Sequence, residues 1–169
     1  SLQASLRSNM DRMELPVHVV TRLNRMMCET TTEDKFATLF YGCLDMDKDI
    51  VYYTNAGHVF PVVLRAGGRL ETLDYSGLIL GVIPEFQYEL RTVELGLGET
   101  LIIVSDGVTE AANAANEFFG ERRLAEVLSA SGGKSAQEVR DAIVTGVKSF
   151  TENAAAGDDL TILVLRRKQ

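Results

Sequence analysis

The order of strand-like and helix-like segments restricts the possible folds of this chain more than any other feature. Two apolar segments, 36–45 and 49–55, are separated by the turn sequence MDKD, which predicts a β-hairpin. Residues 60–75 read as two short strands around an Ala-Gly-Gly turn. Alternating residues at 86–95 and an apolar run at 101–106 add two more strands, so the middle of the chain is rich in β-structure.

Helical periodicity flanks these strands. Apolar residues recur at helical spacing in 15–30, where Pro16 suits a first turn. The segment 135–153 opens with Ser135 and Glu138 at the spacing of a capping box. The remaining helix-like segments are 1–10, 110–118 and 121–130, and a last strand-like segment covers 159–166. This order, without regular alternation of strands and helices, predicts an α+β fold.

Length and composition indicate one domain spanning residues 1–169, of which 46% are hydrophobic. No apolar run is long enough to cross a membrane, and the first ten residues lack the apolar core of a signal peptide, so we expect a cytoplasmic protein. The net charge of −7 argues against a nucleic-acid-binding surface. Cys28 and Cys43 have no metal-like spacing and are expected to be buried as small apolar residues.

Aspartates stand at the boundaries of two apolar strands. Asp106 follows the strand at 101–105, and Gly107 beside it is expected to let the backbone turn sharply. Asp158 and Asp159 precede the last strand. If these two strands lie side by side and antiparallel, the carboxylates meet at one rim of a sheet.

Carboxylates gathered in this way need a counter-charge. Two like charges about 4 Å apart repel by roughly 4 kcal/mol at an effective dielectric constant near 20. Oxygen ligands suit Mg²⁺ or Mn²⁺, and two such ions can activate a water that attacks a phosphate ester. The alternative is that Asp106 forms an ordinary turn and that the Asp158–Asp159 pair lies in a solvated loop or caps a helix.

Taken in order, several motifs resemble those of the PPM-type (2C class) metal-dependent protein phosphatases. The resemblance is to the bacterial branch typified by stage II sporulation protein E and the stress-response regulator phosphatases, and it covers essentially the whole chain. It rests on the stretches FATLFYGCLD, YYTNAGHVFPVVLR, GLILGV, LIIVSDGVTEA, FGERRL and GDDLTILVLR.

The resemblance implies an antiparallel β-sandwich flanked by α-helices on both faces, and a protein serine/threonine phosphatase activity. Asp106 and Asp158 match metal-binding aspartates, Asp159 is the second choice if the register shifts by one, and Gly107 shapes the first metal loop. No catalytic residue is implied beyond the water on two Mn²⁺ or Mg²⁺ ions. The implied substrate is a phosphorylated anti-sigma-factor antagonist in bacterial signalling, and the implied neighbour in a full-length protein is an upstream sensor or receiver domain.

Two motifs of that family are not found here: an early Gly-Asp strand, and a glycine-rich Asp-Gly turn before the first long helix. We therefore expect the chain to begin after the first strands of the fold, with weak or absent metal binding. The missing strands would leave sheet edges unpaired, and we expect the chain to form a homodimer or to aggregate through such an edge.

Four other polar residues allow two interpretations each. His58 in TNAGH could be a general acid, but a turn built on its neighbours is the alternative. Glu110 and Asn113 could contact a substrate, or Glu110 could favour the start of a helix. His18, among valines of the first long helix, is expected to be structural or to lie at the surface.

Three functions follow from these observations. The leading hypothesis is the protein phosphatase module. A catalytically dead phosphatase fold that binds a sigma-factor regulator is the alternative, and residues upstream of Ser1 would discriminate between the two. A phosphohydrolase acting on small molecules is the third, and it predicts a deep pocket. The helices at 1–10 and 15–30 either carry regulatory movement from a sensor or form a plain layer on the sheet.

Overall fold

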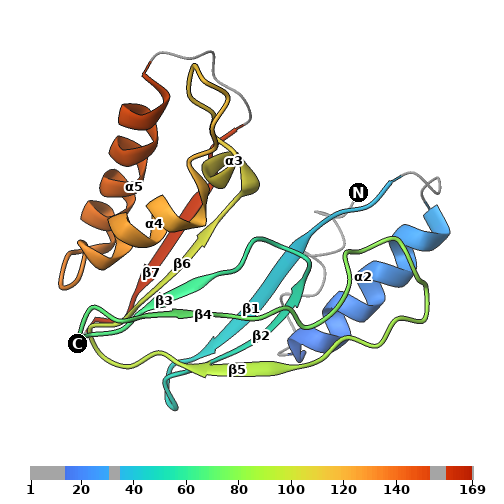
Figure 1. Ribbon diagram of the computed structural model, residues 1–169. Helices are drawn as coiled ribbons and strands as arrows, with labels where there is room; N and C mark the ends of the chain where they lie inside the picture. Colours follow the sequence, from blue (N-terminus) through green and yellow to red (C-terminus); the bar gives the residue numbers. More distant parts are fainter. Residues whose placement is uncertain (1–13, 31–34, 153–158, 169) are drawn as a thin grey trace. The chain divides into compact units, whose positions relative to one another are not determined.

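The computed structural model describes residues 14–30, 35–152 and 159–168 (Figure 1). They form two compact units that alternate along the chain. Unit 1 comprises residues up to His58 and the segment Asp74–Glu94, and unit 2 comprises Val59–Leu73 and the chain from Leu95 onward. Each unit has its own sheet and its own apolar core.

Unit 1 is a three-stranded antiparallel sheet with one helix packed on it. The sheet order is β1-β2-β5, and the hairpin register pairs Asp45 with Ile50 across the predicted turn. Helix α2 has its apolar residues on one side, and Val19, Val20 and Leu23 are completely buried there. The elements are α2 (Pro16–Thr30), β1 (Leu39–Asp45), β2 (Ile50–Ala56) and β5 (Arg91–Glu94).

Unit 2 is a four-stranded antiparallel sheet, in the order β4-β3-β6-β7, with helices packed on one face. Ile102 and Val104 of β6 are buried in one core cluster with Leu128, Val139 and Ile143 of those helices. The elements are β3 (Val62–Leu64), β4 (Leu70–Thr72), β6 (Thr100–Val104), α3 (Asp106–Thr109), α4 (Gly120–Ser129), α5 (Ala136–Thr151) and β7 (Ile162–Arg166).

Most of the expected elements are present. The α+β class and the antiparallel pairing are confirmed, as are the helix at 15–30 and the hairpin of 36–45 with 49–55. The capping box is also confirmed, because Ser135 Oγ accepts from the Glu138 N–H and the Glu138 carboxylate accepts from the Ser135 N–H at 2.8 Å. The proposed helix at 1–10 lies outside the described residues.

Two predictions about local structure are wrong. The segment 110–118 is not helical, because the short helix α3 ends at Thr109 and the chain then forms turns closed by Asn113. Asn113 Oδ1 accepts from the N–H groups of Ala115 and Glu117, both at 2.9 Å. The strand expected over 86–95 is confined to Arg91–Glu94. Within the part of the chain that the structure describes, no helix is long and apolar enough to span a membrane.

Candidate functional site

The end of β6 and the start of β7 meet at one rim of the unit 2 sheet. The two strands pair antiparallel, with Val104 opposite Ile162. Beyond this pair, the Ser105 N–H donates to the Thr161 carbonyl at 2.9 Å, and the Thr161 N–H donates to Ser105 Oγ at 3.0 Å. The Ser105 hydroxyl also donates to the Asp159 carbonyl at 3.2 Å. We call Ser105, Asp106 and Asp159 the β6–β7 rim.

Asp106 is exposed at the first position of α3. Its Oδ1 accepts from the N–H of Gly107 at 2.9 Å, which orients the carboxylate at the helix start. The Asp106 carbonyl accepts from the Glu110 N–H at 2.7 Å and from the Thr109 hydroxyl at 3.2 Å. A carboxylate at the start of a helix is also favoured by the helix dipole.

Gly107 plays a different part from the one expected. It is buried in α3 and is not among the glycines with positive φ, so the turn after β6 is a helical turn and not a left-handed one. The chain does change direction here, from β6 into α3, but Gly107 takes helical backbone angles that do not require glycine. Glu110 stands at the C-terminal cap of α3, so its predicted place at a helix start is wrong.

Two of the three predicted metal-binding carboxylates, Asp106 and Asp159, lie in the part of the chain that the structure describes. The antiparallel pairing of the two strands is confirmed, and it brings Asp106 and Asp159 to the same end of the sheet. Asp158 lies outside the described residues. Among the residues described, no three His, Cys, Asp or Glu side chains are close enough together to hold a metal ion. The rim therefore offers oxygen ligands of the type that Mg²⁺ and Mn²⁺ prefer, but not a complete set within the described chain.

The TNAGH segment in unit 1 is a hydrogen-bonded turn. Asn55 is completely buried, its Oδ1 accepts from the His58 N–H at 2.9 Å, and its Nδ2 donates to the His58 carbonyl at 3.2 Å. Gly57 has a φ of 70°, which favours glycine. These contacts support the turn interpretation over a general acid. His18 is exposed on α2, as expected for a surface residue.

Asn24 is a buried polar residue that the sequence patterns did not single out. It lies on the apolar side of α2, with none of its surface exposed. Its Nδ2 donates to the Ile83 carbonyl at 2.7 Å, and its Oδ1 accepts from the Gly81 N–H at 2.9 Å. A polar residue at a core position of an amphipathic helix is the signal that could have revealed this contact.

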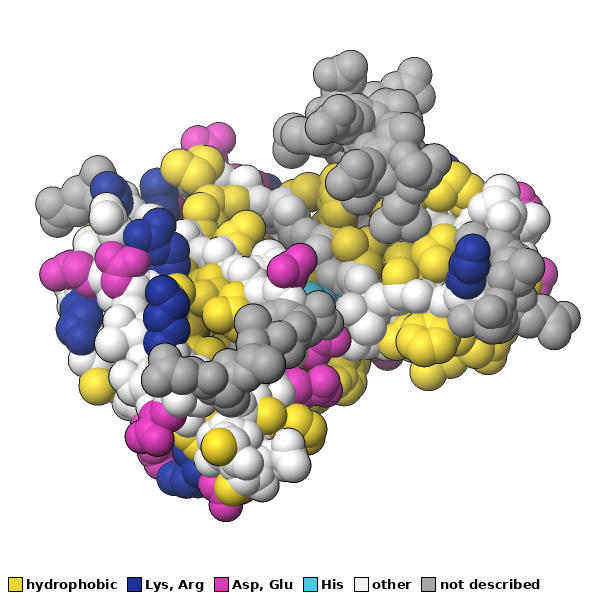
Figure 2. All heavy atoms as spheres, turned by 90° about the horizontal axis from the view of Figure 1, so that it is seen from above, with side chains coloured by type: hydrophobic (Ala, Val, Ile, Leu, Met, Phe, Trp, Pro, Cys, Tyr) yellow, Lys and Arg dark blue, Asp and Glu magenta, His cyan; other side chains and the backbone are white. Residues whose placement is uncertain are grey.

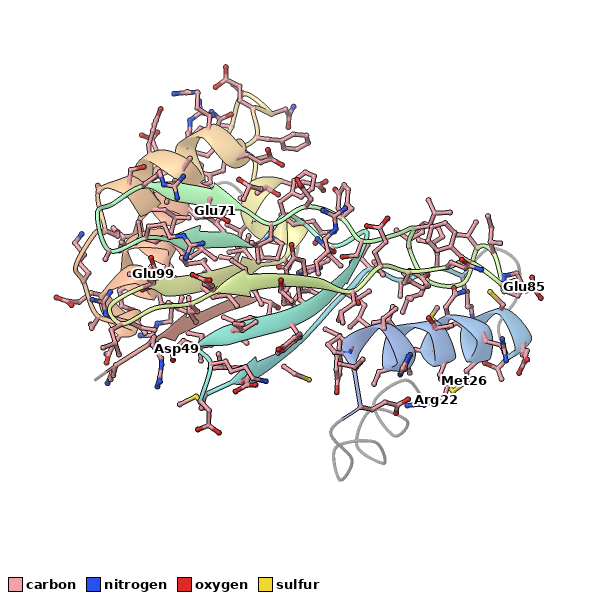
Figure 3. The ribbon with its side chains drawn as sticks, turned by 90° about the horizontal axis from the view of Figure 1, so that it is seen from below. Arg22, Met26, Asp49, Glu71, Glu85 and Glu99 are labelled. Atoms are coloured by element: carbon pink, nitrogen blue, oxygen red, sulfur yellow. The ribbon has the colours of Figure 1, made fainter. Side chains whose placement is uncertain are left out.

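Unit 2 contains a partly buried cluster of ion pairs around Arg65. The Arg65 guanidinium donates to Glu99 Oε2 at 2.6 Å and to Glu71 Oε2 at 2.8 Å; Figure 3 labels both glutamates. The Arg65 side chain is only 17% exposed. The two carboxylates raise the pKa of Arg65 against the opposing effect of its burial. These ion pairs join β3, β4 and the loop before β6.

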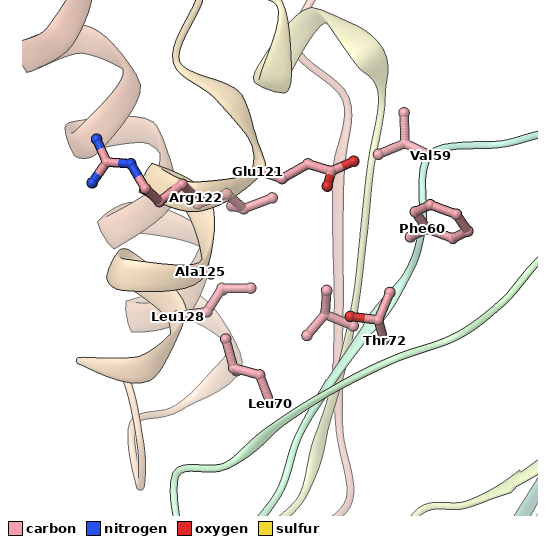
Figure 4. A pocket seen from close by; sticks show the side chains of 10 residues that line it. Val59, Phe60, Leu70, Thr72, Glu121, Arg122, Ala125 and Leu128 are labelled. Carbon is pink, nitrogen blue, oxygen red and sulfur yellow. The ribbon is translucent and has the colours of Figure 1, made fainter.

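A cavity of about 320 Å³ lies between the β3–β4 hairpin and α4 (Figure 4). Phe60, Leu70 and Leu128 give it an apolar lining, and Glu121 is its one acidic side chain. Arg122 is its one basic side chain. Acidic and basic side chains are interspersed on the face shown in Figure 2.

Comparisons with known proteins agree on one family. The family model described as "Stage II sporulation protein E (SpoIIE)" matches residues 1–168. Protein IcfG of Synechocystis sp. is 33% identical over 132 residues, which are 78% of this chain and 21% of that protein. Phosphoserine phosphatase RsbU of Bacillus subtilis is 30% identical over 154 residues, which are 90% of this chain and 45% of that protein. The chain thus spans less than half the length of either relative.

Solved structures show the same fold. The SiaA-PP2C domain of Pseudomonas aeruginosa superposes with a TM-score of 0.82 at 18% identity, over 98% of this chain and 65% of that one. The phosphatase domain of SpoIIE from Bacillus subtilis, presoaked with Mn, superposes with a TM-score of 0.66 at 21% identity, over 99% of this chain and 71% of that one. The described strands and helices therefore follow the PP2C phosphatase fold.

Proposed function

The chain belongs to the stage II sporulation protein E family, and on that basis we propose that it is a metal-dependent protein serine/threonine phosphatase module. The observation that carries the proposal is the β6–β7 pairing, which brings the predicted carboxylates Asp106 and Asp159 to one rim. A relative 30% identical is named a phosphoserine phosphatase, which supports the same reaction class. The family match runs through both units, which supports treating them as parts of one domain.

We assign the metal ligands to the residues at this rim. Asp106 is held at the start of α3 by the Gly107 N–H, and its carboxylate faces solvent, so it is accessible to a cation. Asp158 would be the ligand at the start of β7, or Asp159 if the register shifts by one. A divalent cation, Mn²⁺ or Mg²⁺, would activate a water and neutralise charge on the phosphate when bound.

The groups around Asp106 have a positioning role in this proposal. The Ser105 hydroxyl and N–H tie the end of β6 to Thr161 and Asp159, which keeps the two strand ends together. Gly107 supplies a backbone N–H that fixes one carboxylate oxygen of Asp106. A rim held by backbone bonds in this way would present its carboxylates without rearrangement.

We propose a phosphorylated anti-sigma-factor antagonist as the substrate, acting in the bacterial cytoplasm, with an upstream sensor or receiver domain in the longer protein. The support is the match to the stage II sporulation protein E family and the 30% identity to phosphoserine phosphatase RsbU. The alternative is a binding module for a sigma-factor regulator without catalysis. One observation favours it: the described residues hold no complete metal-ligand cluster.

The experiment is Mn²⁺-dependent hydrolysis of a phosphoserine peptide by the chain and by the Asp106→Asn variant. We expect the variant to lose about 100-fold or more in rate, because the cation and its activated water would be lost. Asp141→Asn, an exposed aspartate on α5, is the matched control and should keep the rate of the parent chain.

Three outcomes separate the candidate functions. Hydrolysis that falls only in Asp106→Asn supports the phosphatase proposal. Hydrolysis that is unaffected by Asp106→Asn contradicts the assigned site. No hydrolysis by any variant contradicts catalysis by this chain and favours the binding module.

A further inference from the structure

The cavity between the β3–β4 hairpin and α4 is formed entirely within unit 2 (Figure 4). Its ten lining residues all come from the segment 59–72 and from α4. Leu124 and Leu128 of α4 are buried, and Leu70 of β4 packs against the same core cluster. The walls of the cavity are therefore continuous with the apolar core of unit 2.

The side chains on one face of α4 explain why this space is not filled. Glu121, Ala125 and Leu128 follow one another at helical spacing, so they lie on the same face of the helix. Ala125 contributes only a methyl group to the wall. The resulting volume of about 320 Å³ is near the lower end of the range for small-molecule sites, roughly 300–1,000 Å³. The space thus suits an organic molecule smaller than a typical drug.

The polar groups at the cavity have one sign of charge left over. Figure 4 shows the Glu121 side chain extending over the cavity toward Val59, whereas Arg122 extends in the opposite direction. Arg122 also forms an ion pair with Glu126 on the same helix. Within the described part of the chain, neither the Glu121 carboxylate nor the Thr72 hydroxyl has a hydrogen-bond or ion-pair partner. The cavity therefore presents a carboxylate without a counter-charge.

We propose that this cavity binds small organic amines in their protonated form. The apolar body of such a ligand would pack against Leu70 and Leu128 and displace water from their surfaces. Its ammonium group would pair with the Glu121 carboxylate, which selects a cation over an anion. The alternative role of Glu121, an acid favoured by the dipole in the first turn of α4, predicts no preference for cations in the cavity.

The size of the cavity favours a small molecule over a partner protein. Ten residues line it, whereas a stable protein–protein interface uses about 20–30 residues on each side. A concave apolar site with a few polar groups at its border is the usual form of a small-molecule site.

Three probes of nearly the same shape and different charge test the proposal. Phenethylamine is cationic at neutral pH, phenethyl alcohol is neutral and phenylacetate is anionic. Each is titrated into the chain while its amide NMR signals are followed. We expect phenethylamine to shift the signals of Leu70, Thr72 and Ala125 with a Kd on the order of 1 mM. Phenethyl alcohol should bind about tenfold more weakly because it forms no ion pair, and phenylacetate should not bind.

Variants of α4 test the assigned contacts. Glu121→Gln should weaken phenethylamine binding about tenfold and leave phenethyl alcohol binding unchanged. Asp141→Asn is the matched control, because Asp141 is an exposed carboxylate on α5, and it should change neither. Ala125→Leu should abolish binding of both probes, since leucine fills the space and is also a good helix former.

Several outcomes overturn the proposal. Phenylacetate that binds as tightly as phenethylamine does so, as does phenethylamine binding that is unchanged in Glu121→Gln. The absence of shifts around the cavity with all three probes rules out a small-molecule site and favours a side chain of a partner protein as the occupant. The probe series uses the parent chain, so it remains decisive if Ala125→Leu does not fold. It measures binding and not hydrolysis, so its outcome is independent of the proposed phosphatase activity.

Discussion

Single polar side chains determine how two segments of unit 1 meet. Asn24 satisfies the Gly81 N–H and the Ile83 carbonyl from within a helix, and its side chain is completely buried. A buried amide that loses these partners leaves backbone groups without hydrogen bonds, which costs more than the bond itself is worth. Asn24 thus supplies the polar contacts between α2 and residues 81–84.

We expect Asn24→Ala to lower the free energy of unfolding by about 2–3 kcal/mol, since it leaves a donor and an acceptor of the backbone unsatisfied. Urea unfolding followed by circular dichroism measures the change. Arg25→Ala, an exposed neighbour on the same helix, should change stability by less than about 0.5 kcal/mol. Equal losses in the two variants would contradict the role given to Asn24.

Tyr88 shows the opposite case, a buried hydroxyl with no hydrogen-bond partner in the described part of the chain. Burial raises its pKa to about 12. The unfolded side chain ionises near pH 10, while the folded one stays protonated up to about pH 12. The free energy of unfolding therefore keeps its full value below pH 10 and decreases as the pH rises from 10 toward 12.

Tyr88→Phe should therefore raise the free energy of unfolding by about 1 kcal/mol at neutral pH and reduce the loss above pH 10. Thermal unfolding at a series of pH values tests both effects. Tyr75→Phe is the control, because Tyr75 is 44% exposed. If the two variants follow the same pH profile, the alkaline loss does not come from Tyr88.

At the scale of one helix, α5 begins at a point that its side chains specify. Ser135 and Glu138 exchange hydrogen bonds with each other's backbone N–H. The bond from the Ser135 side chain lowers the pKa of Glu138, with the backbone bond adding to the effect. The pKa of Glu138 is thus lower in the folded than in the unfolded protein. Its contribution to the free energy of unfolding is therefore fully present when the pH is above the unfolded pKa, and it is lost as the pH falls through the folded pKa.

Ser135→Ala should destabilise the protein by about 1 kcal/mol at neutral pH, because one backbone donor at the helix start loses its acceptor. The difference from the parent should shrink when unfolding is measured below the ordinary pKa of glutamate, where Glu138 becomes protonated. Ser149→Ala, at an exposed position of the same helix, should have little effect. A constant difference at all pH values would exclude Glu138 from the cap.

The sequence predicts elements well where local signals and packing agree. The turn between β1 and β2 and the start of α5 carry such signals, and both are where they were expected. The error at 110–118 has a physical cause. Its alanines favour a helix, but Asn113 bonds to nearby backbone groups instead and Asn116 takes a φ of 58°, both typical of turns.

The candidate site was predictable to a similar extent. Aspartates at strand ends indicated the rim on the condition that the two strands pair antiparallel, and the structure shows that β6 and β7 do so. The conformation at Gly107 was not predictable, because Asp-Gly is compatible with a left-handed turn and with the first turn of a helix. The partners of Asn24 lie almost sixty positions away in the sequence, beyond the reach of local patterns.

At the scale of the whole molecule, the two units are interleaved in sequence. The hairpin of β3 and β4 belongs to unit 2, although unit 1 segments stand on both sides of it in the chain. No single cut of the chain would therefore separate the units. Their sheets rely on pairings between residues far apart, such as Thr100 with Arg166, which favours slow folding.

The place of β7 in the chain has a consequence for biosynthesis. A ribosome that has completed β6 must still translate α3, α4 and α5 before the neighbouring strand emerges. During that interval, β6 has β3 on one side only, and Asp106 has no strand end opposite it. The acidic rim is thus assembled late in synthesis, so the proposed cation site would be completed only after the helices of unit 2 had been made.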